Sequence, residues 1–206
     1  MDNQLRLVLR KRPALNPGNY PLYGFTFVID PGHGGSDPGA LGPMGRDMAE
    51  MHINWINSAA LAEMLENLGA QVILTRNIDE GLTLSERVAV SRNTLPDMFI
   101  SMHANSTAET TNAGNIHGFS MWYRNANSRP LAQHFFEALY DINPLTNRAM
   151  SINQANFYVV RPSWTPSVLF EVSFMNNIQD FAWMIDPQNQ AYLARGIVDA
   201  ILDYFE

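Results

Sequence analysis

Two histidines of this chain follow apolar segments of the kind that form buried strands. His33 lies in a turn rich in Pro and Gly after residues 25–29, and His103 comes directly after residues 98–102. Glycines let the backbone of such a turn adopt unusual angles and approach a bound group closely. A histidine held at the end of a strand can bind a metal or transfer protons. Taken alone, each histidine could also be a structural residue that hydrogen-bonds its neighbours.

Two glutamates could complete a catalytic set with these histidines. Glu50 begins a helical pattern with apolar positions on one face, where the helix dipole also favours an acid. Glu171 lies within the apolar segment 168–174, where a carboxylate loses hydration unless a charge or hydrogen bond compensates it. Two His, one carboxylate and an open position make a catalytic zinc set, and another glutamate can then move protons. The alternatives are a solvated acid at Glu50 and an outward-facing acid or buried ion pair at Glu171.

The segments that carry these residues alternate between short apolar runs and helical patterns. This alternation predicts a single α/β layered domain with a mainly parallel, roughly six-stranded sheet flanked by helices. Sites in such folds lie at the carboxyl ends of strands, so His33 and His103 can meet although they are distant in sequence. The predicted strands are 25–29, 71–75, 98–102, 118–123, 156–160 and 168–174; the predicted helices run from Glu50 to a stop at Gly69 and over 84–93, 130–140 and 187–205.

Composition places the chain among ordinary globular domains. It has 206 residues, 46% of them hydrophobic, which is enough for one domain with its own core. It has no cysteine, which excludes disulfides and thiolate metal sites. The net charge of −7 argues against nucleic acid as the main partner and against tight electrostatic binding to an anionic cell wall. No apolar run approaches the ~20 residues of a membrane span.

Five motifs occur together in an order known from one family. Through them the chain, from about Phe25 to Glu206, resembles the zinc-dependent N-acetylmuramoyl-L-alanine amidases of the Amidase_3 type. Each motif alone is weakly specific, whereas five in order are highly specific. The motifs are Asp30-Pro31-Gly32-His33-Gly34-Gly35 with Asp37-Pro38-Gly39-Ala40, Glu50 with Ile53-Asn54, Ser101-Met102-His103-Ala104-Asn105, Asn156-Phe157-Tyr158-Val159-Val160-Arg161, and Glu171-Val172-Ser173-Phe174-Met175-Asn176-Asn177.

The resemblance implies a cofactor, a reaction and roles for four residues. Zn²⁺ would be bound by His33, Glu50 and His103, and Glu171 would be the catalytic glutamate. The substrate would be peptidoglycan or muropeptides, cut at the amide between N-acetylmuramic acid and L-alanine. Two other functions stay open from the residues alone: another zinc hydrolase, such as a peptidase or deacetylase, and an inactive wall-binding module.

Several residues near the motifs have two readings. Asn105, Arg161 and His117 are candidate substrate contacts, with structural hydrogen bonding as the alternative. Arg76 and Arg87 are expected to form ion pairs within the scaffold. The aromatic residues of the motif that ends at Arg161 are expected to be mostly core.

The sequence also predicts how the chain is divided into segments. Residues 1–24 mix basic and apolar residues with prolines and are predicted to be a linker or the remnant of a preceding domain; residues 25–206 are predicted to be the catalytic domain. The segments 106–118 and 140–157 are too short or too polar for a covering helix, so an open groove is expected.

The resemblance also implies a location: an amidase of this type acts in the extracytoplasmic cell envelope, in periplasm or cell wall. No signal peptide is visible in this chain, and retention on the wall is expected to need a binding module or activator elsewhere.

Overall fold

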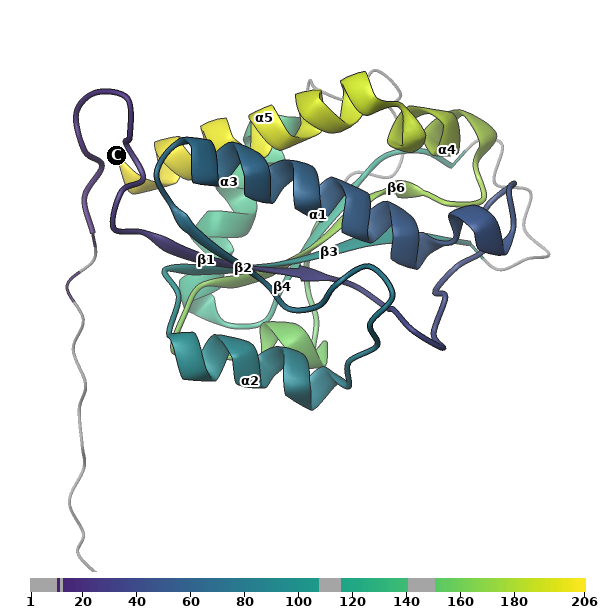
Figure 1. Cartoon of the computed structure of the whole chain (residues 1–206), viewed down its shortest axis with the longest axis horizontal. Coiled ribbons are helices and arrows are strands. Elements are labelled where there is room, and N and C mark those ends of the chain that lie inside the picture. The colour runs from purple at the N-terminus through teal and green to yellow at the C-terminus, as the bar shows by residue number, and fades with distance from the viewer. Residues whose placement is uncertain (1–10, 12, 108–115, 141–150) are drawn as a thin grey trace, which may run out of the picture.

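A computed structural model describes residues 11, 13–107, 116–140 and 151–206. In these residues a six-stranded sheet of order β2-β1-β3-β6-β4-β5 lies between helices on its two faces (Figure 1). Strands β2, β1, β3 and β6 are parallel, β4 is antiparallel to β6, and β5 is parallel to β4. The predicted α/β fold with a mainly parallel sheet is confirmed. The strands are β1 (Thr26–Pro31), β2 (Gln71–Leu74), β3 (Met98–Asn105), β4 (Ser120–Tyr123), β5 (Ser151–Gln154) and β6 (Ser167–Phe174).

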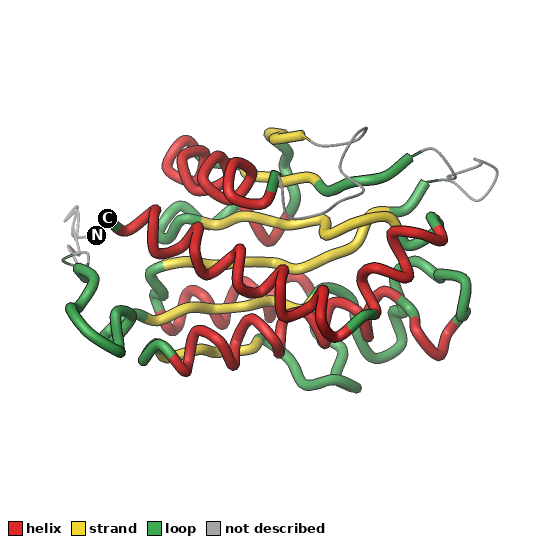
Figure 2. The backbone as a smooth tube through the Cα atoms, turned by 90° about the horizontal axis from the view of Figure 1, so that it is seen from above, coloured by secondary structure: helices red, strands yellow, loops and turns green. Residues whose placement is uncertain are grey.

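The helices divide unequally between the two faces of the sheet. Three long helices, α1 (Glu50–Asn67), α3 (Arg129–Leu139) and α5 (Pro187–Phe205), cover one face, and α1 and α5 lie side by side over the strands (Figure 2). The other face is covered by α2 (Leu84–Thr94) and the short 3-10 helix η4 (Tyr158–Val160). The remaining helices are α4 (Ile178–Ile185) and the 3-10 turns η1 (Arg46–Met48) and η3 (Ala126–Ser128).

Each face has its own hydrophobic core. The larger core lies under the three long helices, where the strands contribute side chains such as Phe27, Ile100 and Phe170. The smaller core lies under α2 and η4. Its buried members are Val28, Phe99, Val159, Val160 and Leu169.

Four of the predicted helices are confirmed as α1, α2, α3 and α5, with ends within a residue or two. The helix α4 was not predicted. The predicted strand 156–160 is wrong, because this segment contains η4 and the edge strand β5 comes before it. A short apolar run does not distinguish a strand from other buried structure. Here Val159 and Val160 are buried, whereas Phe157 and Tyr158 are partly exposed.

Part of the N-terminal segment packs against the domain. Leu22 is fully buried, and its N–H donates to the carbonyl of Leu68 after α1. The division of the chain at residue 25 stays a prediction. Most of the segments 106–118 and 140–157, on which the expectation of an open groove depends, lies outside the described residues.

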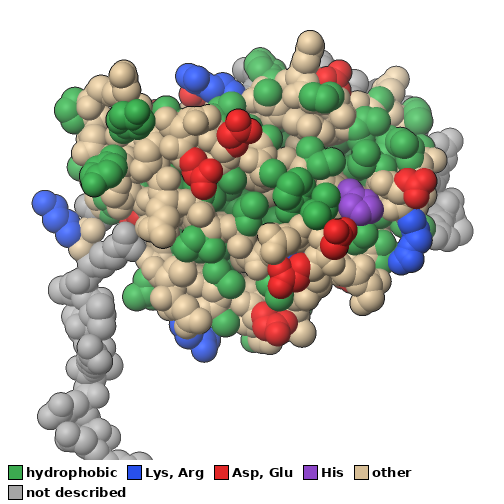
Figure 3. Space-filling view, in the orientation of Figure 1, with side chains coloured by type: hydrophobic (Ala, Val, Ile, Leu, Met, Phe, Trp, Pro, Cys, Tyr) green, Lys and Arg blue, Asp and Glu red, His purple; other side chains and the backbone are tan. Residues whose placement is uncertain are grey.

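Charged side chains are unevenly distributed over the side of the molecule that Figure 3 shows. Acidic side chains are scattered over this face, and Lys and Arg side chains lie at its margins (Figure 3). No helix among the described residues combines the length and hydrophobicity that crossing a bilayer requires.

Candidate active site

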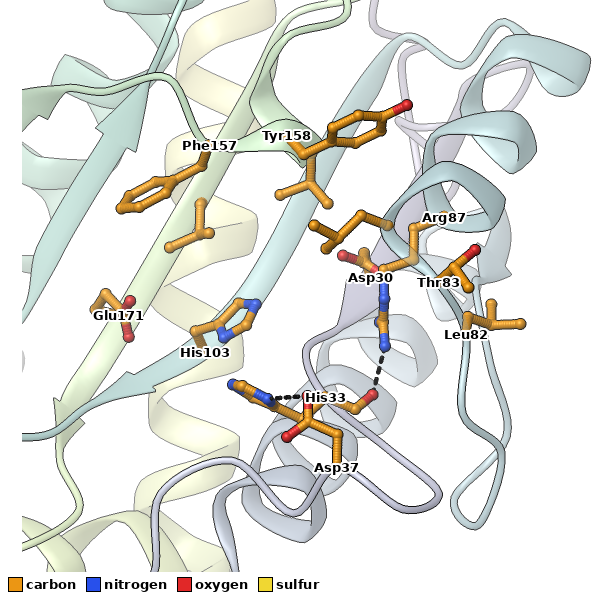
Figure 4. A pocket seen from close by; sticks show the side chains of 13 residues that line it. Asp30, His33, Asp37, Leu82, Thr83, Arg87, His103, Phe157, Tyr158 and Glu171 are labelled. Carbon is orange, nitrogen blue, oxygen red and sulfur yellow. Dashed lines mark hydrogen bonds and ion pairs between the residues drawn. The ribbon is translucent and has the colours of Figure 1, made fainter.

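The two motif histidines meet because β1 and β3 are parallel neighbours. Pro31 pairs with Met102 in the register of these strands, so both chains leave the sheet at the same edge. The rings of His33 and His103 lie with centroids 4.9 Å apart, and they face each other in Figure 4. Gly32 permits this approach, since a Cβ there would lie 2.3 Å from the His103 ring.

Two buried arginines hold the turn that carries His33. His33 has a φ of 58°, an unusual conformation for a residue other than glycine. Arg76 Nε and Nη2 donate to the carbonyls of Pro31 and Gly32 at 2.8 and 2.9 Å, and Nη2 also donates to Met51 in the first turn of α1. Arg87 donates to the carbonyls of Pro31 and His33. Because both guanidinium groups bond backbone carbonyls, they fix the path of the turn.

The buried carboxylate of Asp30 helps to hold Arg87, and through it the turn that carries His33. Asp30 is fully buried and accepts hydrogen bonds from Thr75, Ser101 and Arg87 at 2.6 to 2.8 Å. The expected ion pair of Arg87 is thus present, with Asp30. For Arg76 no ion pair is found among the described residues, where its five hydrogen bonds go to backbone carbonyls.

Glu50 reaches the histidines from the first residue of α1. Its Oε1 lies 3.2 Å from His33 Nε2 and 3.1 Å from His103 Nδ1. Its two oxygens also accept from the backbone N–H groups of Ala40 and Ala104 at 2.9 and 3.1 Å. Burial raises the pKa of Glu50, but the hydrogen bonds and charges of the two histidines outweigh it and hold this pKa far below its usual range. Glu50 is therefore an anion at neutral pH.

These three side chains offer a donor set that suits zinc. One nitrogen of each histidine and one oxygen of Glu50 lie within 4.8 Å of one another. His33 Nδ1 is 2.8 Å from Asp37 Oδ2, and because an ionised carboxylate only accepts, this nitrogen carries the proton and leaves Nε2 for a metal. A carboxylate behind a metal-binding histidine is a common means of fixing its tautomer and orientation. Two imidazoles and one carboxylate match the ligand types of catalytic zinc sites.

The pKa of His33 responds to this acidic setting. Burial lowers the pKa of His33, but hydrogen bonds and charges from Glu50 and Asp37 outweigh it and raise this pKa to about 9. Without a metal ion, protonated His33 beside ionised Glu50 thus supplies the positive charge that the site attracts. Such a site binds a cation and releases protons in exchange.

Glu171 lies beside this set on the next strand. It pairs with His103 in the β3–β6 register and, in Figure 4, lies beside that ring. Its Oε2 is buried and has no hydrogen-bond partner among the described residues. Burial, reinforced by the charge of Glu50, raises the pKa of Glu171 to about 7 against the opposing charges of the histidines. A carboxylate with one unused oxygen and a pKa near neutrality can accept and return a proton.

A pocket of about 380 Å³ opens from these residues toward α2 and η4. His33, His103 and Glu171 line the end of the pocket that is nearest the candidate zinc ligands (Figure 4). Its remaining lining residues are Asp30, Asp37, Leu82, Thr83, Leu84, Arg87, Phe157, Tyr158, Val159 and Leu169.

The three candidate substrate contacts do not line this pocket, and their contact with substrate stays a prediction. Asn105 Nδ2 donates to Ser120 Oγ at 3.3 Å. Arg161 donates to the carbonyl of Asn156, and its guanidinium lies 5.0 Å from the ring centre of Tyr158. His117 Nδ1 is 3.0 Å from Asn177 Nδ2 and 3.5 Å from Asp180 Oδ1.

Sequence reasoning missed some of the residues that shape the site. Asp37 stands four residues after His33 in the same turn, a spacing that could have indicated its role. Phe157 and Tyr158 were expected in the core, but they are 42% and 38% exposed and line the pocket. No local pattern indicates that these two residues line the same pocket as His33 and His103.

Comparison with known proteins agrees with this geometry. Residues 27–203 match the family Amidase_3, described as N-acetylmuramoyl-L-alanine amidase. The chain is 31% identical to the N-acetylmuramoyl-L-alanine amidase LytC of Bacillus subtilis and 32% identical to the probable cell wall amidase LytH of Staphylococcus epidermidis, in alignments that cover 90% of this chain. These alignments span only 36% of LytC and 60% of LytH.

A solved structure leads to the same family. The catalytic domain of CwlV, an N-acetylmuramoyl-L-alanine amidase from Bacillus (Paenibacillus) polymyxa, superposes with a TM-score of 0.78 at 32% identity, covering 87% of this chain and 97% of that one. Sequence and structure together show that the chain belongs to the Amidase_3 family of N-acetylmuramoyl-L-alanine amidases.

Proposed function

We propose that this chain uses Zn²⁺ to hydrolyse the amide between the lactyl group of N-acetylmuramic acid and L-alanine in bacterial peptidoglycan. The observation that carries the proposal is the buried, unpartnered Oε2 of Glu171 beside the donor atoms of His33, Glu50 and His103. Such a carboxylate is costly to maintain unless it serves a cation or a proton transfer nearby. The bond that is cut is inferred from membership of the amidase family.

The mechanism assigns each residue one task. His33 Nε2, His103 Nδ1 and Glu50 Oε1 would hold the ion, and Zn²⁺ bound there would supply Lewis acidity to the amide carbonyl and lower the pKa of water. Glu171 takes a proton from the attacking water, whose oxygen forms the new bond to the carbonyl carbon. As the carbon–nitrogen bond breaks, Glu171 returns the proton to the leaving amine of L-alanine. Asp37 keeps the His33 ring oriented throughout.

The setting of the reaction follows from its substrate. Peptidoglycan lies outside the cytoplasmic membrane, so we infer that the chain acts in the extracytoplasmic envelope as a wall-degrading enzyme of the autolysin type. Its net charge of −7 opposes retention by an anionic wall. We therefore infer that a wall-binding module or an activator, on another segment or another chain, brings it to the wall.

Product analysis tests this proposal directly. Purified peptidoglycan is digested with the zinc-loaded protein, with and without a chelator, and the products are identified by mass spectrometry. We expect stem peptides with a free L-alanine amine and uncut glycan strands, and no release with chelator until zinc is restored. Cleavage within the peptide, cleavage between sugars or undiminished activity in chelator would contradict the proposal.

A further inference from the structure

Among the described residues, the pocket described above extends from the candidate metal-binding residues toward α2 and η4. It runs from His103 and Glu171 toward the gap between α2 and η4. A scissile amide at the metal has two different substituents, the muramoyl group on its acyl side and the stem peptide on its amine side. The chemistry of the pocket wall decides which of them it receives.

The wall includes four aliphatic side chains and two aromatic rings. Phe157 and Tyr158 lie on one side of the opening, and Leu82 and Thr83 lie across it (Figure 4). Phe157 packs edge-on against Trp122 with ring centroids 5.3 Å apart, which fixes its orientation. Arg161, which lies outside the pocket lining, stacks on Tyr158 and supports that ring from outside. Rigid aromatic faces of this kind suit the C–H face of a sugar ring.

The charges of the pocket disfavour the stem peptide. Its lining contains the carboxylates of Asp30, Asp37 and Glu171, and its Arg87 and His33 side chains are already paired with Asp30 and Asp37. The Arg87 guanidinium is already bonded to Asp30 and to the carbonyls of Pro31 and His33. A stem peptide brings carboxylates, which would find no available partner on the described wall and would be costly to desolvate there. The muramoyl group is neutral once its lactyl carboxyl forms the amide.

On these grounds we propose that the pocket between α2 and η4 binds the muramoyl ring, with Phe157 and Tyr158 as the contacts that recognise it. This inference rests on the proposed function, since it concerns the same scissile bond. It orients the substrate: the glycan side lies toward α2, and the stem peptide leaves the metal on the opposite side. A pocket of about 380 Å³ is within the size range of small-ligand sites.

A pair of substrates that differ only on the acyl side tests the orientation. One is an N-acetylmuramoyl pentapeptide, and the other is the same pentapeptide carrying an (R)-lactoyl group without the sugar ring. We expect the native protein to prefer the muramoyl substrate in kcat/KM, mainly through a lower KM. In Tyr158→Ala and Phe157→Ala this preference should fall by about tenfold, because an apolar contact with the ring is lost.

Matched variants separate recognition from loss of structure. Tyr158→Phe keeps the ring and should retain most of the preference. Tyr192→Ala removes a tyrosine that is 54% exposed on α5, away from the pocket, and should retain all of it. Zinc content and melting temperature are measured for every variant, so that a change in substrate preference is read only from folded, metal-loaded protein.

The outcomes distinguish this inference from the proposed function. An equal loss on both substrates in the alanine variants would place the peptide in the pocket and overturn the inference. The same conclusion follows if the native protein shows no preference, or if the preference survives both alanine substitutions. If zinc-loaded protein cleaves neither substrate at the lactyl–alanine amide, the proposed function itself fails.

Discussion

The two faces of the sheet differ in how completely helices cover them. On one face α1 packs over β1, β2 and β3, α3 packs over β4 and β5, and with α5 they enclose the larger core. On the other face the described cover is α2 and the short η4, above a smaller core that includes Val28, Phe99 and Leu169. Farther along β1, β3 and β6 the same face carries polar residues, namely Asp30, Ser101, His103 and Glu171. The candidate active site therefore lies on the face with less helical cover, and the larger hydrophobic core lies on the other face.

Strand β6 shows the division within a few residues. Phe170 is buried in the larger core, while Leu169 and Glu171 line the pocket on the other face. Because successive side chains of a strand point to opposite faces, one strand can serve stability and reactivity at once. From this difference we expect substitutions on the face that α2 and η4 cover, here called the thin face, to change zinc binding and turnover more than the free energy of unfolding. The following experiments test this expectation.

The largest expected effect comes from removing a metal-binding side chain. His103→Ala leaves only two donors at the zinc set, so we expect zinc affinity to fall by more than about 100-fold and activity to be lost. The fold should persist, because the His103 ring is not part of either core. Metal analysis after dialysis and circular dichroism check both statements. Full zinc occupancy in this variant and in His33→Ala would refute the ligand assignment.

The next effect separates metal binding from catalysis. Glu171→Gln keeps the size of the side chain but cannot accept a proton, so turnover should fall by roughly 10²–10⁴-fold. Zinc content should stay near that of the native protein, because three other residues hold the ion. Glu63→Gln, an exposed change of the same type on α1, is the control. Loss of zinc together with activity would make Glu171 a ligand, and near-native turnover would make it a structural acid.

A pair of leucines compares the two faces in stability alone. Leu61→Ala on α1 truncates a fully buried side chain of the larger core and should cost about 3–5 kcal/mol in the free energy of unfolding. Leu169→Ala truncates a side chain at the pocket, where water can fill the space, and should cost about 2 kcal/mol. Urea unfolding of metal-free protein measures both. An equal or larger cost at Leu169 would show that the thin face also carries the fold.

The last expected effect is a pH dependence of stability at Glu171. Its folded pKa of about 7 lies above the ordinary 4.5, so its contribution is fully present below pH 4.5 and is lost as pH rises through about 7. Metal-free native protein should therefore lose about 2–3 kcal/mol relative to Glu171→Gln across this range. Urea unfolding of both proteins at several pH values, in chelator, measures the difference. Parallel pH curves would mean that Glu171 is not desolvated in solution.

Much of the fold could be predicted from local pattern, and the failures have physical causes. The long periodic helices were found because α1 and α5 repeat their apolar positions over many residues. The segment 156–160 was assigned wrongly because a run of five residues is too short to show a period. Of the site, the metal-binding residues could be proposed from their types and motif order. The role of Tyr158 could not, because the pocket that it lines is formed by η4 together with α2, which is far away in sequence.

The sequence by itself determined which residues could do chemistry and to which family the chain is similar. Local patterns of residue types were enough to identify the turn around His33, the strand that ends near His103 and the acid at Glu171. Only the tertiary structure decided which of these residues lie together and how their surroundings change their pKa values. The register of β1, β3 and β6 brings the two histidines and Glu171 together, and burial on the thin face raises the pKa of Glu171. These properties depend on distances and desolvation between residues far apart in the chain, which no local pattern encodes.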